Sequence, residues 1–204
     1  MRVLVACEYS GVVRDAFLAA GHDAMSCDLL PTDVPGPHYT GNVFDVIGNG
    51  WDLLIAHPPC TYLSNSGVRW LATDITRWPH LIEGAVFFRN ILNADIPRVA
   101  VENPIMHHYA SDIIGARQTQ IVQPWMFGHP EQKATGLWLR GLSPLTPTND
   151  VKAHMMTLTT AERNRVHYAS PGPDRWKLRS TTYAGIAAAM AAQWGAPDLL
   201  SAVA

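Results

Sequence analysis

The chain has 204 residues and a mass of 22.4 kDa, enough for one domain with a sizeable hydrophobic core. Hydrophobic residues make up 48% and charged residues 16% of the chain, a globular composition that argues against intrinsic disorder. The net charge of −2 and the pI of 6.5 do not support tight nonspecific DNA binding, although residues 1–60 are acidic and residues 61–204 mildly basic.

No apolar run reaches the roughly 20 residues that a membrane span needs. The charged Glu8 comes too early for a signal peptide, so we expect a cytoplasmic protein. The three cysteines, Cys7, Cys27 and Cys60, form no disulfide framework and no CxxC pair. No metal-ligand spacing is evident, and we expect no metal.

Strands and helices are predicted to alternate through the first half of the chain. The predicted buried strands are residues 2–7, 23–28, 51–56 and 98–101. The predicted helices are residues 12–20, 78–93 and, near the end, 183–194. This alternation indicates an α/β fold with a mostly parallel sheet and helices on both faces.

The second half of the chain has a different pattern. Residues 118–141 alternate apolar and polar side chains around a Gly-His-Pro turn, which predicts an antiparallel pair of strands. Residues 143–180 show weak periodicity, so we expect an extended loop region with one short helix near residues 160–166.

Polar or reactive groups follow all four predicted parallel strands. They are residues 7–11, Asp28, residues 57–60 and residues 102–104. Ligands of open parallel sheets bind beyond the carboxyl ends of the strands, so these groups mark a candidate site. Asp28 is suited to a ribose diol, although a solvated loop aspartate explains it equally well.

The most specific segment is His57-Pro58-Pro59-Cys60. Two prolines stiffen the chain before Cys60, as a thiolate nucleophile requires, whereas a buried structural cysteine is the alternative. Glu102-Asn103-Pro104 supplies a carboxyl group at the end of the next strand. Glu102 could serve as an acid or as a hydrogen-bond partner of a heterocycle, or form a surface salt bridge.

These motifs resemble the cytosine-5 DNA methyltransferase superfamily, and most closely its short phage-type members. The matching blocks follow the family's order: VLVACEYSG, GNVFDV, WDLLIAHPPCTYLSNSG, VAVENP, FGHPEQKATGLWLRGL and RSTTYAGIAAAMAAQWG. The resemblance covers most of the chain and implies one Rossmann-like methyltransferase domain over residues 1–204 that uses S-adenosylmethionine.

The resemblance also implies roles for individual residues. Cys60 would add to carbon 6 of cytosine, Glu102 would donate to ring nitrogen 3, and Lys133 would stand where the family carries an arginine. The residues implied for the cofactor are Cys7, Glu8, Gly11, Asp28, Asn42, Val43, Pro58, Ser180 and Thr181. The family usually has glycine at the places of Glu8 and Ser10, and aspartate at the place of Asn42.

DNA is the substrate that the resemblance implies, in the cytoplasm of a bacterium or of a phage-infected host. The candidate substrate-binding residues are Ser64, Gln132, Thr135, Arg140, Arg163, Arg165, Arg175, Lys177 and Arg179. The five cations between residues 163 and 179 could contact phosphates, and a solvated basic face is the alternative. Residues 142–180 would form a reduced recognition region, because the family's separate recognition domain is missing. Two alternatives stay open: methylation of a free cytosine nucleotide such as dCMP, and a catalytically silent protein that binds nucleic acid or another protein.

Overall fold

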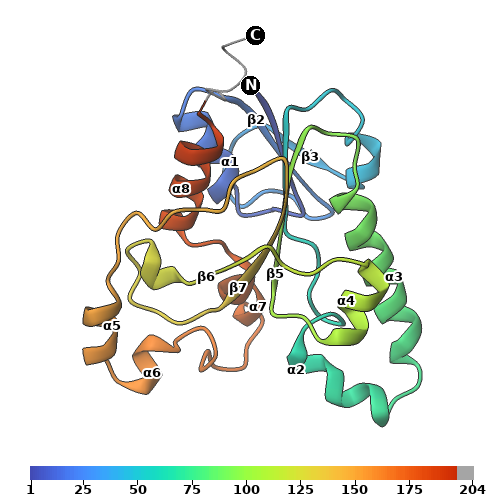
Figure 1. Ribbon diagram of the computed structural model, residues 1–204, viewed down its shortest axis with the longest axis vertical. Coiled ribbons are helices and arrows are strands. Elements are labelled where there is room, and N and C mark those ends of the chain that lie inside the picture. Colours follow the sequence, from blue (N-terminus) through green and yellow to red (C-terminus); the bar gives the residue numbers. More distant parts are fainter. Residues whose placement is uncertain (197–204) are drawn as a thin grey trace.

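The computed structural model describes residues 1–196, which form one twisted sheet with helices on both faces (Figure 1). The strands are β1 (Arg2–Ala6), β2 (Asp23–Asp28), β3 (His38–Thr40), β4 (Leu53–Ala56), β5 (Arg98–Pro104), β6 (Gln120–Val122) and β7 (Thr135–Arg140). The α-helices are α1 (Val12–Ala19), α2 (Asn65–Val68), α3 (Arg77–Leu92), α4 (His108–Ile114), α5 (Lys152–Thr157), α6 (Thr160–Arg163), α7 (Arg175–Ser180) and α8 (Ala184–Trp194). Three 3-10 turns, η1 (Val43–Asp45), η2 (Arg69–Ala72) and η3 (Pro124–Met126), complete the described elements.

The sheet has the strand order β3-β2-β1-β4-β5-β7-β6. The first five strands are parallel, and β7 pairs antiparallel with both β5 and β6. The expected Rossmann-like α/β class is therefore confirmed, and so is the expected antiparallel pair within residues 118–141. Among residues 1–196, no helix combines the length and the apolar character that crossing a membrane requires.

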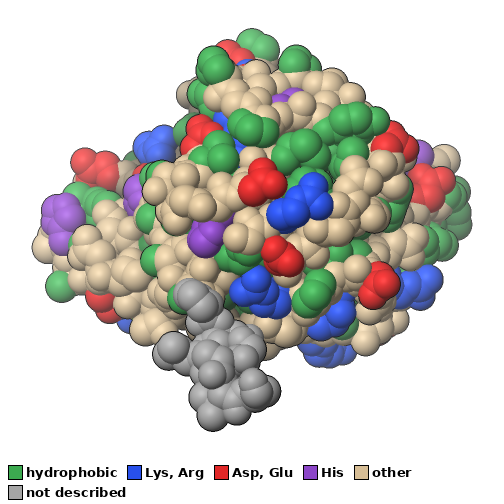
Figure 2. Space-filling model, turned by 90° about the horizontal axis from the view of Figure 1, so that it is seen from above, with side chains coloured by type: hydrophobic (Ala, Val, Ile, Leu, Met, Phe, Trp, Pro, Cys, Tyr) green, Lys and Arg blue, Asp and Glu red, His purple; other side chains and the backbone are tan. Residues whose placement is uncertain are grey.

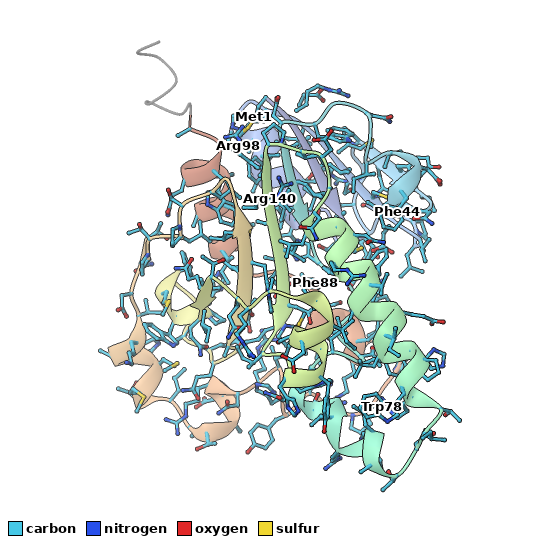
Figure 3. All side chains as sticks on the ribbon, turned by 45° about the vertical axis from the view of Figure 1, so that its right-hand side comes forward. Met1, Phe44, Trp78, Phe88, Arg98 and Arg140 are labelled. Atoms are coloured by element: carbon cyan, nitrogen blue, oxygen red, sulfur yellow. The ribbon has the colours of Figure 1, made fainter. Side chains whose placement is uncertain are left out.

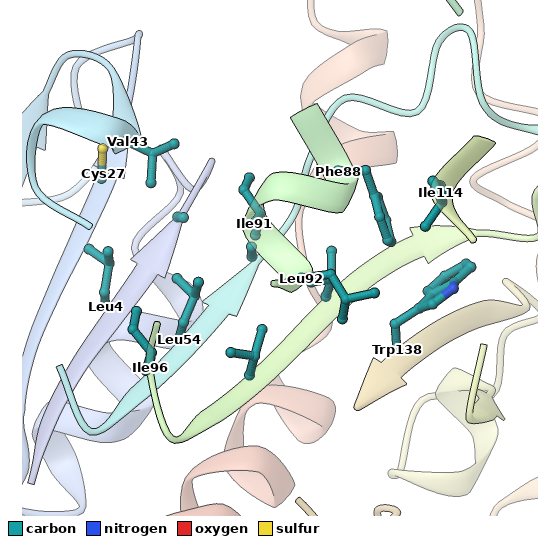
Figure 4. Packing of buried hydrophobic residues seen from close by; sticks show 14 of the residues in the cluster. Leu4, Cys27, Val43, Leu54, Phe88, Ile91, Leu92, Ile96, Ile114 and Trp138 are labelled. Atoms are coloured by element: carbon teal, nitrogen blue, oxygen red, sulfur yellow. The ribbon is translucent and has the colours of Figure 1, made fainter. Parts of the chain in front are cut away.

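Alternate residues of the buried strands point to two separate cores, as the two-residue period of a strand dictates. On one face, Leu4 and Leu54 pack under α3, whose Phe88 meets Trp138 of β7 at 5.0 Å between ring centroids (Figure 4). On the other face, Val5 and Ile55 pack against α1 and α8. Burial on both faces explains why these strands read as continuous apolar runs.

Several elements differ from the prediction. The short edge strand β3 lies in a segment read as a loop, because its three residues are too few to show alternation. Strand β5 continues past Val101 to Pro104, since Glu102 and Pro104 pair with Leu137 and Thr135 of β7. The region 143–180 holds α5, α6 and α7 where we expected one helix, and α2 and α4 were not predicted. These short helices carry little periodicity of their own.

The position of Arg140 corrects one prediction. Because β7 runs antiparallel to β5, Arg140 pairs with Val99 at the amino end of the parallel strands. Its guanidinium donates to the carbonyl oxygens of Leu92, Ala94 and Ile96. Figure 3 places it near Arg98 and Met1, far from Trp78 at the opposite end. Arg140 therefore cannot contact a substrate held at the carboxyl ends of the strands.

Acidic and basic side chains intermingle on the end of the molecule that carries the N-terminus (Figure 2). The same end holds the exposed ion pair between Arg2 and Asp23. Exposed pairs of this kind contribute little to stability. The polar residues that follow the parallel strands lie at the other end of the sheet.

Candidate active site

Hydrogen bonds hold the segment after β4 against the carboxyl end of β5. The backbone N–H of His57 donates to Ala6 at 3.0 Å, which extends the parallel ladder one residue beyond β4. Asn103, only 1% exposed, donates from Nδ2 to the carbonyl oxygen of Pro58 at 2.7 Å. This bond ties the Pro-Pro-Cys segment to the Glu-Asn-Pro segment, so Cys60 and Glu102 belong to one rigid unit.

A buried histidine faces the candidate acid. His57 Nδ1 lies 3.0 Å from Glu102 Oε2, and the two side chains are only 9% and 17% exposed. Burial lowers the pKa of His57, but its hydrogen bond and charge interaction with Glu102 outweigh this effect and leave that pKa raised. Burial raises the pKa of Glu102, and the same partner more than reverses it, so that pKa is lowered. Each group therefore favours the charged form of the other.

His57 is the residue of the site that sequence reasoning did not assign. The signal was present in the expected sheet. Ala56 and Val101 are register partners on neighbouring parallel strands, so the residues that follow them, His57 and Glu102, emerge side by side. A register prediction for the two strands would have paired them.

Cys60 lies partly exposed at the start of the turn after β4. Burial and then the charge of Glu102 raise the pKa of its thiol, while Arg179 and Lys133 act in the opposite direction. The thiol, the carboxylate and two cations thus share one electrostatic environment. Two of the expected catalytic residues, Glu102 and Lys133, are therefore brought into the surroundings of Cys60.

The start of β7 completes the surroundings of Glu102. Thr135 is buried, its hydroxyl donates to the carbonyl oxygen of Lys133 at 3.2 Å, and its side chain also lowers the pKa of the Glu102 carboxyl. Lys133 contributes a nearby positive charge, and its ammonium lies 5.7 Å from the ring centroid of Tyr183. A cavity of about 10 Å³, lined by Glu102, Lys133, Thr135 and Tyr183 among others, has room for about one water molecule.

A larger cleft lies on the α3 side of the sheet. Its volume is about 200 Å³, and it is lined by Cys7, Cys27, Asp28, Leu29, Gly41, Asn42, Val43, Pro59 and Phe87. Four of the residues expected to bind the cofactor, Cys7, Asp28, Asn42 and Val43, are among them. Pro59 lines this cleft and is bonded directly to Cys60, so the cleft and the thiol are neighbours.

The other expected cofactor residues do not line this cleft. Glu8 is 4% exposed and accepts from the backbone N–H groups of Val13 at 2.7 Å and Arg14 at 3.2 Å. It therefore serves the amino end of α1, where a carboxylate complements the helix dipole, and the expectation that it faces the cofactor is corrected. Pro58 is held by Asn103 instead.

Gly11 has a structural role in the turn between β1 and α1. Its φ of 74° is a left-handed conformation, and a Cβ there would lie 2.5 Å from Nη2 of the buried Arg14. Arg14 donates in turn to the carbonyl oxygens of Val34 and Pro35. Gly11 thus allows Arg14 to hold the loop that follows the cleft residue Asp28.

Asn42 lies at the cleft but uses its amide oxygen differently from the expectation. The Oδ1 atom accepts from the backbone N–H of Phe44 at 3.1 Å and caps η1. Capping turns Oδ1 toward the chain itself, while Asn42 and Val43 both line the cleft.

Helix α7 closes over the first loop. Ser180 lies 3.0 Å from the hydroxyl of Tyr9, and Lys177 pairs with Asp33 at 2.8 Å. Tyr9 and Trp176 add an aromatic contact with 5.1 Å between ring centroids. The expected cofactor residues Ser180 and Thr181 therefore end a helix that is attached to the turn after β1.

Most of the expected phosphate-binding cations have partners within the protein. Arg165 pairs with Glu131 at 2.9 Å, Arg175 donates to the carbonyl oxygen of Ala169, and Lys177 pairs with Asp33. Arg163 has a buried Nε without a partner among the described residues. Arg179 is the member of this group whose charge reaches Cys60.

Two further expected substrate residues have mainly structural contacts. Ser64 is 8% exposed, and its hydroxyl lies 2.9 Å from that of Ser66. Gln132 donates its backbone N–H to the carbonyl oxygen of Arg163 at 2.6 Å, which joins the segment before β7 to the end of α6. Within residues 1–196, no three His, Cys, Asp or Glu side chains are grouped as metal ligands would be.

No protein family and no curated protein matches the sequence. Among solved structures, a DNA modification methyltransferase encoded within an E. coli prophage is 15% identical, with a TM-score of 0.46 over 68% of this chain and 46% of that one. S. pombe Dnmt2 methyltransferase is also 15% identical, with a TM-score of 0.45 over 80% and 56%. WbdD, solved with a kinase inhibitor, is 12% identical, with a TM-score of 0.37 over 73% and 37%.

The chain thus spans about half the length of the first two structures, which are both described as methyltransferases.

The thiol environments predict an order of chemical reactivity. Burial and nearby carboxylates raise the pKa of Cys7 to about 12 and that of Cys27 to about 11. The pKa of Cys60 is raised less strongly. Because the thiolate is the reactive form, we expect iodoacetamide to label Cys60 first, at a rate that keeps rising with pH beyond 9. Peptide mass spectrometry after brief labelling measures the order. Earlier labelling of Cys7 or Cys27 would contradict the described geometry.

Proposed function

We propose that this protein transfers a methyl group from S-adenosylmethionine to carbon 5 of cytosine in DNA through a covalent adduct with Cys60. The observation that carries the proposal is the junction at Pro59 and Cys60. Pro59 lines a nucleoside-sized cleft, and the next residue is a partly exposed thiol in the field of Glu102, Lys133 and Arg179. A nucleophile, an acid and a cofactor site are thereby adjacent.

The cleft has the chemistry that the nucleoside part of the cofactor needs. Asp28 ends β2 with one carboxylate oxygen bonded to the N–H of Leu30, which leaves the other for a ribose hydroxyl. Val43 and Phe87 supply apolar surface for adenine. The volume of about 200 Å³ is below the roughly 300 Å³ lower bound of drug-sized sites, and so suits the nucleoside part alone. When bound, S-adenosylmethionine supplies an electrophilic methyl group.

Carbon 5 of cytosine is a poor nucleophile, and covalent addition at carbon 6 makes it a better one. When the Cys60 thiolate bonds to carbon 6, electron density moves through the ring toward nitrogen 3, and carbon 5 gains enamine character. Proton donation at nitrogen 3 stabilises the adduct, and Glu102 is the group in place for it. Lys133 and Arg179 are close enough to Cys60 to stabilise its thiolate before it attacks.

DNA is favoured over a free nucleotide by the surface of the segment that follows the thiol in the sequence. The segment after Cys60 forms α2 and η2 and exposes Trp70 to 48%, with the guanidinium of Arg69 at 4.7 Å from its ring centroid. Exposed aromatic rings beside cations are typical of surfaces that contact unstacked bases and phosphates. A base within a duplex must leave the stack to reach such a thiol. In this proposal, residues 142–180 form a reduced recognition region for DNA. The protein acts in the cytoplasm.

The proposal predicts methyl transfer that depends on one sulfur atom. Purified protein given methyl-labelled S-adenosylmethionine and duplex DNA should produce 5-methylcytosine, and Cys60→Ala should abolish transfer while leaving cofactor affinity within a few-fold. The thiol bonds to the base and not to the sulfonium, so the two readouts separate. Label on dCMP and not on DNA would favour the nucleotide alternative. Absence of both transfer and cofactor binding would favour a silent binding protein.

A second prediction concerns the carboxyl group at the end of β2. Asp28→Asn should weaken S-adenosylmethionine binding by about 10-fold or more, since hydrogen bonds to charged groups contribute about 1.5 to 3 kcal/mol. Isothermal titration calorimetry measures the affinity. Asp23→Asn is the matched control, because Asp23 begins the same strand at the opposite end. Equal affinities for the two variants would remove Asp28 from the cofactor site.

A further inference from the structure

The His57 ring has one bonded and one unbonded nitrogen. Nδ1 is 3.0 Å from Glu102 Oε2, whereas Nε2 is buried without a hydrogen-bond partner in the described part of the chain. A buried polar nitrogen left without a partner is costly, which a role in structure alone does not explain. The contact with Glu102 is thus the one side-chain bond described for this ring.

The charges around His57 come from three neighbouring elements. Glu102 belongs to β5, Glu8 follows β1 and also favours the protonated ring, and Lys133 precedes β7 and opposes it. The two carboxylates prevail, so the pKa of His57 is raised and the imidazolium form of the ring is favoured. Glu102, which the proposed function needs as a proton donor, is meanwhile held as a carboxylate.

We propose that His57 is the positioning residue that stores the proton which Glu102 passes to the substrate. This inference rests on the proposed function and assigns the source of its proton. It also explains how an acid can be needed where the structure holds a carboxylate. His57 touches neither base nor cofactor in this account and acts through Glu102.

The proton moves from His57 through Glu102 to the base as Cys60 adds to it. The Cys60 sulfur forms a bond to carbon 6, and the π electrons of the ring shift toward nitrogen 3. Nitrogen 3 takes a proton from Glu102, and Glu102 takes the Nδ1 proton of His57 in the same step or just before. His57 ends neutral, Glu102 ends as a carboxylate, and the base carries the proton. After methyl transfer, a water molecule takes the proton from carbon 5, the Cys60 sulfur leaves carbon 6 as a thiolate, and nitrogen 3 returns its proton through Glu102 to Nδ1 of His57.

The experiment compares two histidines that both face a glutamate. His57→Gln removes the buried pair, and His80→Gln removes the exposed pair between His80 and Glu83, which are 3.4 Å apart. Single-turnover transfer to cytosine in DNA is measured from about pH 5.5 to 10. Affinities for S-adenosylmethionine and DNA are measured beside it.

The wild-type rate should rise with pH as Cys60 ionises and level off once His57 begins to lose its proton, with this break above the ordinary histidine pKa of 6.5, because the pKa of Cys60 is raised from 9.0 and its ionisation offsets the loss. In His57→Gln the rate at pH 7.5 should drop by about 10² or more, as for a lost general acid, with affinities within a few-fold. The pH at which its rate levels off should be lower, because Glu102 would have to keep its own proton. Combining it with Glu102→Gln should add little further loss, and His80→Gln should behave as wild type.

The outcomes separate this inference from the proposed function. If wild type neither methylates nor forms an adduct with DNA, the proposed function fails. If wild type is active and His57→Gln keeps its rate and pH profile, the role of His57 is refuted and the function stands. Should His57→Gln not fold, NMR of the labelled imidazole decides: the pKa of His57 should lie above 6.5 in wild type and fall in Glu102→Gln. An unshifted pKa in that variant would overturn the inference.

Discussion

The parallel register of β1, β4 and β5 is the constraint on which the rest of the site depends. Ala6, Ala56 and Val101 lie side by side on these strands, so the residues that follow them leave the sheet at one level. A slip of one residue would turn each side chain to the opposite face of the sheet. In register, His57 meets Glu102, and Asn103 reaches Pro58. The apolar residues of both cores hold this register, so packing far from the site sets its geometry.

A buried histidine and glutamate are not a means of stabilising the fold. Removing two charges from water costs free energy that their mutual attraction only partly returns, and apolar residues of similar size often stabilise a fold as well or better. Perturbed titratable groups concentrate where chemistry needs them. The pair stands between the turn after β1 and the start of β7, and it adjoins both the thiol and a cavity with room for one water molecule. Its position is better explained by proton transfer than by stability.

The sequence predicted the parts that depend on short-range pattern. Continuous apolar strands, the helix after Gly11 and the polar strand ends follow from periodicity and turn chemistry, and they place Cys60 and Glu102 at one edge. Contacts between distant segments were not accessible in this way. How elements pack determines that Glu8 accepts hydrogen bonds from α1 and that Lys177 pairs with Asp33. Strand direction determines that Arg140 lies at the amino end of the parallel strands. The role of His57 was not predicted because it depends on a contact with Glu102, which lies 45 residues away in the sequence.

The central claim is that Cys60 bonds to the pyrimidine before the methyl group moves. The most direct measurement uses DNA that contains 5-fluorocytosine together with S-adenosylmethionine, because fluorine at carbon 5 cannot leave as a proton and the adduct stays trapped. Intact-mass spectrometry should then show one covalent complex per protein, with the bond mapped to the peptide that carries Cys60. Methylation of ordinary cytosine by a protein that never forms this complex, or a complex mapped to another residue, would contradict the account.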